Sequence, residues 1–257
     1  MTRVEGVILA SGGSRVLGTY YAPDGEARRP AVVLLHGLPG TEKNLDLAHH
    51  LRRSGIGCLA ISFRGAWGSE GDFHMDHLIP DTQAALDWLE PRANVEPSRL
   101  GLVGYSLGGW AALEATALDR RVHAVAALAP LLDGSSVDIP PGLAEESARV
   151  LRGAGAESIT AQWHALPAIA RHAAALSGRP VLLATADRDA AFPPAHYAAL
   201  VDLIPGVDWV RFPEADHTFI SVRPGLCHTV AQWLLRALDS TREVQVDPER
   251  PRSDRLV

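Results

Sequence analysis

A serine flanked by two glycines is the feature of this sequence with the clearest chemical potential. Residues 103–109 read VGYSLGG, with an apolar run typical of a strand before them and a segment rich in helix-forming residues after them. A sharp turn between such a strand and such a helix lifts a serine hydroxyl above the sheet, in a strained backbone conformation. The turn requires Gly104 and Gly108, because a Cβ atom at either position would clash. The pattern predicts that Ser106 is a nucleophile.

A serine hydroxyl needs a base to take its proton, and that base is usually a histidine oriented by a carboxylate. After a Gly-x-Ser-x-Gly turn, the expected chain order is serine, then acid, then histidine. Asp189 and His217 follow Ser106 in this order, each just beyond an apolar run that predicts a strand. Because the carboxyl ends of parallel strands share one edge of a sheet, we expect the three side chains to meet there.

Two other acids compete with Asp189 for the orienting role. Asp187 lies in the same loop, where acidic side chains commonly bond to nearby backbone N–H groups and only shape the turn. Asp133 follows the preceding expected strand and is a more remote alternative. We favour Asp189 because residues 189–193, DAAFP, suit a loop that folds back over the end of its strand.

An acyl-transfer reaction also needs two donors for the developing oxyanion. The N–H of Leu107, at the start of the helix after the serine, is the first expected donor. The second should come from residues 36–40, HGLPG, which follow the apolar run 31–35. Leu38 can supply that N–H, whereas Pro39 has none. The alternative is a glycine-rich turn that only connects a strand to a helix.

The other histidines receive no catalytic role. His36 precedes the expected oxyanion donor, and we assign it a structural hydrogen bond. His123, His172, His196 and His228 fall in expected helices or in a strand, and we expect them to cover the surface.

Four aromatic residues are candidates for the wall of an apolar substrate pocket. They are Trp67, Trp163, Phe192 and Phe219. Packing in the core is an equal alternative for each, since large aromatic rings routinely fill cores.

These residues are embedded in an alternation of strand and helix signals. A hairpin is expected over 4–9 and 16–21, and a charged, proline-containing tail over 241–257. Alternation of this kind predicts an α/β fold with a mostly parallel sheet and helices on both faces. The remaining expected strands are 31–35, 58–63, 99–103, 122–128, 180–185 and 207–212, and the expected helices are 45–54, 80–90, 110–118, 194–204 and 226–238.

Residues 131–178 interrupt this rhythm, with short helical pieces, a Pro-Pro pair and no convincing strand. We interpret them as a helical cap inserted into a core made of residues 1–130 and 179–240.

Composition excludes several classes of function. The chain has 257 residues, 47% of them hydrophobic and 21% charged, with a net charge of −6, which argues against nucleic-acid binding. Residues 1–10 contain too short an apolar run for a signal peptide, and no stretch is long enough to span a membrane. Cys58 and Cys227 are expected to be buried thiols in a reducing cytoplasm, and no Cys/His spacing resembles a zinc site.

Over residues 16–238 the chain resembles the α/β-hydrolase superfamily, whose landmarks match 36–40, 104–109, 189–193 and 216–219. Residues 63–71, FRGAWGSEG, resemble cinnamoyl and feruloyl esterases and the catalytic domain of prolyl-oligopeptidase-like acyl-aminoacyl hydrolases. The chain has no room for the propeller of those peptidases, which favours an esterase.

The resemblance implies a serine hydrolase that cleaves an ester or thioester of a small apolar or aromatic acyl group through an acyl-enzyme. A peptidase or amidase, and a non-hydrolytic acyltransferase, lyase or cyclase, are the alternatives. We expect a small-molecule substrate and neither metal nor organic cofactor. Homo-oligomer formation stays open.

Overall fold

A nine-stranded, mostly parallel sheet organises the part of the chain that the structure, a computed structural model, describes: residues 3–239 and 255–256. The strand order is β1-β2-β4-β3-β5-β6-β7-β8-β9. Strands β1 and β2 form an antiparallel hairpin, and β2 also pairs antiparallel with β4. Every other pair of neighbouring strands in the described sheet is parallel. The expected α/β class is confirmed. The strands are β1 (Arg3–Ser11), β2 (Ser14–Ala22), β3 (Arg29–Leu35), β4 (Gly57–Ser62), β5 (Val95–Tyr105), β6 (Val122–Leu128), β7 (Val181–Ala186), β8 (Asp208–Phe212) and β9 (Arg255–Leu256).

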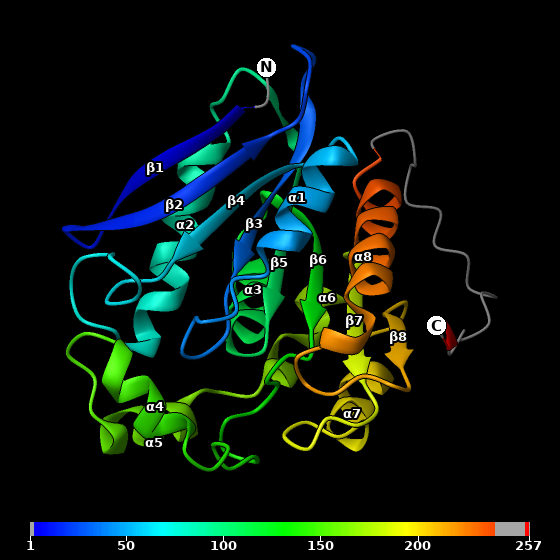
Figure 1. The fold of residues 1–257 in the computed structure, drawn as a ribbon. Coiled ribbons are helices and arrows are strands. Elements are labelled where there is room, and N and C mark those ends of the chain that lie inside the picture. Colours follow the sequence, from blue (N-terminus) through cyan, green and yellow to red (C-terminus); the bar gives the residue numbers. More distant parts are fainter. Residues whose placement is uncertain (1–2, 240–254, 257) are drawn as a thin grey trace.

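Helices connect the strands and cover both faces of the sheet (Figure 1). None of the helices within residues 3–239 combines the length and apolarity needed to cross a membrane. The helices are α1 (Leu45–Arg53), α2 (Leu78–Leu89), α3 (Leu107–Leu118), α4 (Leu143–Val150), α5 (Ala156–Ala165), α6 (Ala173–Leu176), α7 (Ala195–Leu203) and α8 (Arg223–Ala237), with short 3₁₀ turns η1 (Met75–His77), η2 (Ile169–His172) and η3 (Ile220–Val222).

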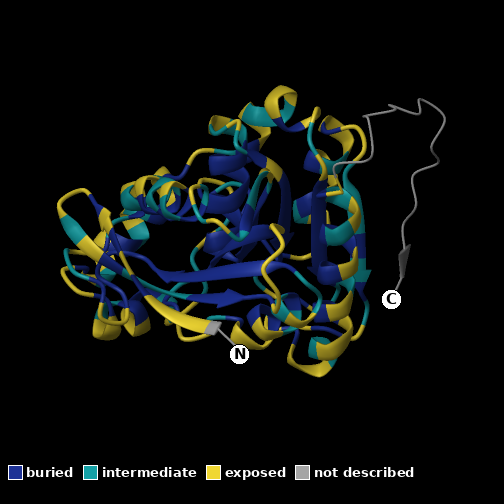
Figure 2. Ribbon diagram, turned by 90° about the horizontal axis from the view of Figure 1, so that it is seen from above, coloured by how far each residue is buried: buried dark blue, intermediate teal, exposed yellow. Residues whose placement is uncertain are grey.

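The central strands separate two hydrophobic cores. Successive side chains of a strand point to opposite faces, so Val33 and Leu35 enter one core while Val32 and Leu34 enter the other. The first core lies beneath α2, α3, α6 and α7, and the second lies beneath α1 and α8. Figure 2 shows the buried strands between helices whose outer sides are exposed. Burial on both faces explains why these strands appear in the sequence as continuous apolar runs.

Residues 131–178, called the β6–β7 segment below, form α4, α5, η2 and α6 without a strand. In Figure 1 the arrowheads of β6 and β7 point toward the side where α4 and α5 lie. Two contacts connect the segment to α3, the helix that follows Ser106. Trp110 Nε1 donates to Pro167 O at 3.0 Å, and buried Glu114 pairs with Arg171 and His172. The segment therefore lies at the end of the sheet where the strands terminate.

Three helices begin earlier than the sequence predicts. Helix α3 begins at Leu107 rather than 110, α8 at Arg223 rather than 226, and α2 at Leu78 rather than 80. Helices α8 and α2 each carry a proline in the first turn, Pro224 and Pro80, which is compatible with that position because the missing N–H has no helical partner to lose. The predicted tail, 241–257, lies outside the described residues except for 255–256, which pair in parallel with β8.

A buried ion pair fixes the loop after β4. Asp81, fully buried in α2, accepts hydrogen bonds from the backbone N–H of Arg64 at 2.8 Å and from its Nε at 2.7 Å. The guanidinium also fills the space above Gly12, where an added Cβ would lie 2.3 Å from Nη1. One carboxylate thus joins the 63–73 loop, α2 and the β1–β2 turn.

Replacing Asp81 by Asn should destabilise the protein by about 3 to 5 kcal/mol, because it leaves the Arg64 charge buried without a counter-ion. Urea unfolding measures the change. Asp87→Asn, in the same helix, removes a mostly exposed partner of Arg121 and should cost less than about 1 kcal/mol. Equal effects of the two substitutions would contradict the role given to the buried pair.

Candidate active site

Ser106 occupies a turn that few residues could adopt. It connects β5 to α3 with φ 55° and ψ −119°, a conformation that is strained for a residue with a side chain. A Cβ added to Gly104 would lie 2.0 Å from Gly108 O, and one added to Gly108 would lie 2.4 Å from Leu35 O. The predicted close approach of the two glycines is therefore present, and it lets α3 start directly against the end of β3.

The structure brings Ser106, His217 and Asp189 into one hydrogen-bonded chain. His217 Nε2 lies 3.1 Å from Ser106 Oγ, and His217 Nδ1 lies 2.6 Å from Asp189 Oδ2. A carboxylate only accepts, so Nδ1 carries the proton and Nε2 is free to accept from the serine hydroxyl. The arrangement can withdraw a proton from Ser106 while the carboxylate stabilises the imidazolium.

The competing acids have other partners. Asp189 is 3% exposed, and its second oxygen, Oδ1, accepts from the N–H groups of Ala191 and Phe192 at 2.8 and 2.9 Å. Asp187 instead forms a bidentate pair with Arg211, from Nε at 3.0 Å and Nη2 at 2.9 Å. It is therefore an ion-pair partner rather than the turn-shaping group considered from the sequence.

The third acid considered, Asp133, accepts from the backbone N–H and the hydroxyl of Ser135 in its own loop. Of the three acids, Asp189 is the one hydrogen-bonded to His217.

Two backbone N–H groups are available beside Ser106. Strands β3 and β5 are parallel neighbours, with Leu35 paired to Gly104, so the loop after β3 and the turn at Ser106 lie next to each other. Neither Leu38 N–H nor Leu107 N–H has a hydrogen-bond acceptor within the described part of the chain. Donors that are free at the first turn of a helix and in an adjoining loop suit a developing oxyanion.

His36 fixes the loop of residues 36–40, called the Leu38 loop below. It is 3% exposed, and its Nε2 accepts from Phe63 N–H at 3.2 Å, so the proton sits on Nδ1, which donates to Gly37 O at 2.7 Å. Burial lowers the pKa of His36 to about 4, because the interior disfavours the charged imidazolium. The predicted structural hydrogen bond is present, in a neutral histidine.

Two aromatic rings contact the imidazole of His217. Tyr105 and Phe192 each place a ring centroid 5.2 Å from the imidazole, and Trp163 from α5 stacks on Phe192 at 6.2 Å. Trp163 and Phe192 are each 1% exposed. The β6–β7 segment therefore reaches the histidine through these two rings.

The other two predicted pocket aromatics lie in different surroundings from each other. Phe219 is fully buried, packs edge-on against Phe212 at 5.7 Å, and belongs to the core beneath α1 and α8. Its full burial there agrees with core packing, the alternative stated for this residue. Trp67 is 41% exposed, donates from Nε1 to Pro39 O at 3.2 Å, and lies under Lys43.

His196 differs from its expected place on the surface. It is partly buried at the start of α7, its ring stacks on Phe192 at 5.2 Å, and its Nε2 accepts from Leu132 N–H at 3.0 Å. The sequence carried one signal for this, a histidine close behind the loop of Asp189, but helical position alone suggested exposure.

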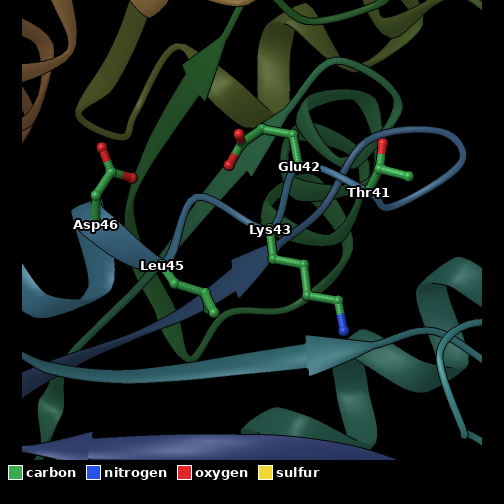
Figure 3. A pocket seen from close by; sticks show the side chains of 5 residues that line it. All are labelled: Thr41, Glu42, Lys43, Leu45 and Asp46. Atoms are coloured by element: carbon green, nitrogen blue, oxygen red, sulfur yellow. The ribbon is translucent and has the colours of Figure 1, made fainter.

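A hollow of about 340 Å³ opens beside the Leu38 loop (Figure 3). In the view of Figure 3, Glu42 and Lys43 point to opposite sides of this loop. Lys43 Nζ donates to Ser62 Oγ at 3.2 Å. None of the three hydrogen-bonded side chains lines the hollow. Its lining residues are Thr41, Glu42, Lys43, Leu45 and Asp46.

Comparison with known proteins decides the family. The model of the alpha/beta hydrolase family matches residues 32–215, which is most of the chain. The chain belongs to the α/β-hydrolase family. The matched range includes Ser106 and Asp189, whereas His217 lies two residues beyond its end.

Individual relatives of this α/β hydrolase match it at low sequence identity. Polyketide transferase ATR5 from Stachybotrys chlorohalonatus is 32% identical over 139 residues, covering 52% of the chain and 46% of the relative. The match thus spans less than half of that relative's length. Among solved structures, 2,6-dihydroxy-pseudo-oxynicotine hydrolase is 21% identical with a TM-score of 0.79, covering 95% of this chain and 70% of that one. Est1E from Butyrivibrio proteoclasticus with bound ferulic acid is 17% identical with a TM-score of 0.73, covering 90% and 99%.

Stability should depend on pH through His36. Above pH 6.5 the histidine is neutral in both the folded and the unfolded chain, so its contribution is fully present. As the pH falls from 6.5 to about 4, only the unfolded chain takes up the proton, and the folded state should lose about 3 kcal/mol of stability. Urea unfolding of the wild type and of His36→Gln over this range measures the loss as the change in their difference. A difference that stays constant with pH would contradict the assignment.

Gly104→Ala should destabilise the protein by more than about 2 kcal/mol, because the new methyl group meets backbone that cannot move aside. Gly178→Ala is the matched control, since nothing lies within 4 Å of the Cβ it would add. Thermal unfolding of both variants gives the comparison. Similar midpoints would show that the turn at Ser106 is not closely packed.

Proposed function

We propose that this α/β hydrolase is a serine esterase that cleaves a carboxylic ester or thioester through an acyl-enzyme. The observation that carries the proposal is the single imidazole placed between Ser106 Oγ and the buried carboxylate of Asp189. Three groups drawn from the loops after β5, β7 and β8 form this chain, and such an arrangement has a definite chemical use.

In the first half-reaction, Ser106 Oγ attacks the carbonyl carbon while its proton passes to His217 Nε2. The carbonyl oxygen becomes an oxyanion, which the N–H groups of Leu38 and Leu107 stabilise. Asp189 stabilises the imidazolium that forms at this moment. As the tetrahedral intermediate collapses, His217 returns the proton to the leaving alkoxide or thiolate. The alcohol or thiol departs, and the acyl group stays on Ser106.

Water completes the cycle by the same route. His217 Nε2 takes a proton from water, and the resulting hydroxide adds to the acyl carbon. The second tetrahedral intermediate expels the Ser106 alkoxide, which regains its proton from His217, and the carboxylic acid is released. The free enzyme is regenerated without any group beyond these side chains and backbone donors.

An apolar or aromatic acyl group suits the surroundings of this site. The stacked pair of Phe192 and Trp163 is buried and makes the side of the site next to His217 apolar, and the β6–β7 segment supplies Trp163. We assign residues 131–178 as the cap over the site, on a core formed by 1–130 and 179–240. Est1E, which has the same fold, is described with ferulic acid bound, and an aromatic acid is the product that this proposal predicts.

Acyl transfer is the second candidate. The relative ATR5 is named a polyketide transferase, and the same acyl-enzyme can pass its acyl group to an alcohol or amine in place of water. Product analysis with added alcohols or amines separates the two outcomes, since hydrolysis yields only the free acid.

Ser106→Ala should lower the rate of p-nitrophenyl butyrate hydrolysis by at least about a thousandfold, because it removes the nucleophile. A fluorophosphonate probe should add one phosphonyl group to the wild type, which mass spectrometry would locate at Ser106. Ser136→Ala, an exposed serine of the β6–β7 segment, is the control and should behave as wild type. Undiminished turnover in Ser106→Ala would end the proposal.

A further inference from the structure

His196 connects three parts of the molecule that meet at the proposed active site. It stands in the first turn of α7, and its imidazole ring stacks on Phe192 with centroids 5.2 Å apart and planes 22° apart. Its Nε2 accepts the backbone N–H of Leu132 at 3.0 Å. A side chain that only filled space would need no such acceptor.

The first connection leads to the proposed base. Phe192 stacks with both His196 and Trp163, and both of these rings are nearly parallel to it. It packs against the imidazole of His217 in a T-shaped arrangement at 5.2 Å and 71°, while Tyr105 contacts the same imidazole at 5.2 Å and 40°. The ring of His217 is therefore bounded by Tyr105 and Phe192, and the position of Phe192 depends on the rings stacked on it.

The second connection leads to the serine. Leu132, whose N–H is bound by His196, follows Leu131, whose own N–H donates to Ser106 O at 3.2 Å. Leu132 O in turn accepts from Ile169 N–H at 2.8 Å, where the β6–β7 segment returns to the core. One histidine thus holds both the start of this segment and the ring beside the base.

The protonation state of His196 supports this role. A backbone N–H can only donate, so Nε2 must be unprotonated to accept from Leu132. Burial lowers the pKa of His196, and although Asp133, Asp189 and the Pro130 carbonyl favour the charged form, burial has the largest effect. The imidazole is therefore neutral at neutral pH, and the acceptor is retained.

We propose that His196 is a positioning residue that holds Phe192 against His217 and fixes residues 131–132 beside Ser106. This inference rests on the proposed function, because it gives His196 its effect through the proposed base. Proton transfer between Ser106 and His217 depends on their 3.1 Å separation, and small displacements of reacting groups lower the rate steeply.

The test compares His196→Leu, which fills the space without an acceptor, with His196→Gln, whose side-chain oxygen can accept from Leu132 N–H. His123→Leu, at an exposed position of β6, is the control. For each variant, kcat and KM are measured with p-nitrophenyl butyrate, and kcat is expressed per active site titrated with the fluorophosphonate. Unfolding midpoints are recorded in parallel.

We expect kcat of His196→Leu to fall at least about tenfold with KM within about twofold of wild type, since positioning acts on the transition state. His196→Gln should recover most of kcat, and His123→Leu should match wild type. A purely structural role would lower the unfolding midpoint of His196→Leu and leave kcat per titrated site unchanged, which would overturn the inference. Equal loss in the Gln and Leu variants would also overturn it, by excluding the hydrogen bond.

If His196→Leu does not fold, Phe192→Leu takes its place, and wild-type kcat in that variant overturns the inference.

Probe labelling of the wild type and the activity of Ser106→Ala distinguish failure of the proposed function from failure of the inference about His196. A wild type that the probe does not label at Ser106, or a Ser106→Ala variant that keeps its activity, refutes the proposed function itself. A labelled wild type with a fully active His196→Leu refutes only the inference about His196.

Discussion

The backbone of Ser106 is held at φ 55° by packing that leaves no room for a β-carbon on either side. Gly104 and Gly108 touch each other, and Gly108 also meets the carbonyl groups at the end of β3. This crowding points the serine side chain away from the sheet and leaves the first N–H of α3 without an acceptor. The same contact places the Leu38 loop beside the turn, so one steric constraint positions both the hydroxyl and the free backbone donors.

The partners of Ser106 depend on a second constraint, the parallel register of the sheet. Strands β5, β6, β7 and β8 pair in sequence order, so the loops after β7 and β8 are carried to the edge where Ser106 stands. Asp189 is fixed there by two backbone N–H groups of its own loop, and it fixes the tautomer of His217. Asp189 lies 83 residues after Ser106, and His217 lies 28 residues after Asp189. The three side chains therefore meet although nothing along the chain restrains them directly.

The parts of the site predictable from sequence are those set by these two constraints. A glycine pattern requires the turn, and strand ends on one edge require the meeting of Ser106, Asp189 and His217. The surroundings of His196 differ from the prediction, and the sequence leaves Phe219 open between pocket and core, because it does not say which side of a loop faces the core and which faces a neighbouring loop. His196 is bound by Leu132, 64 positions earlier in the chain, and Phe219 is buried in a core to which the distant helix α1 also contributes.

Neither constraint places the β6–β7 segment, which is positioned by buried apolar side chains and by backbone hydrogen bonds such as those between Arg152 and the 63–73 loop. Trp110 and Glu114 of α3 hold its end, His196 holds its start, and Trp163 brings it to Phe192. Because Phe192 also contacts His217, a change that shifts Trp163 acts on the proposed base as well. Under the proposed function, the cap and the proton transfer are therefore connected through one aromatic ring.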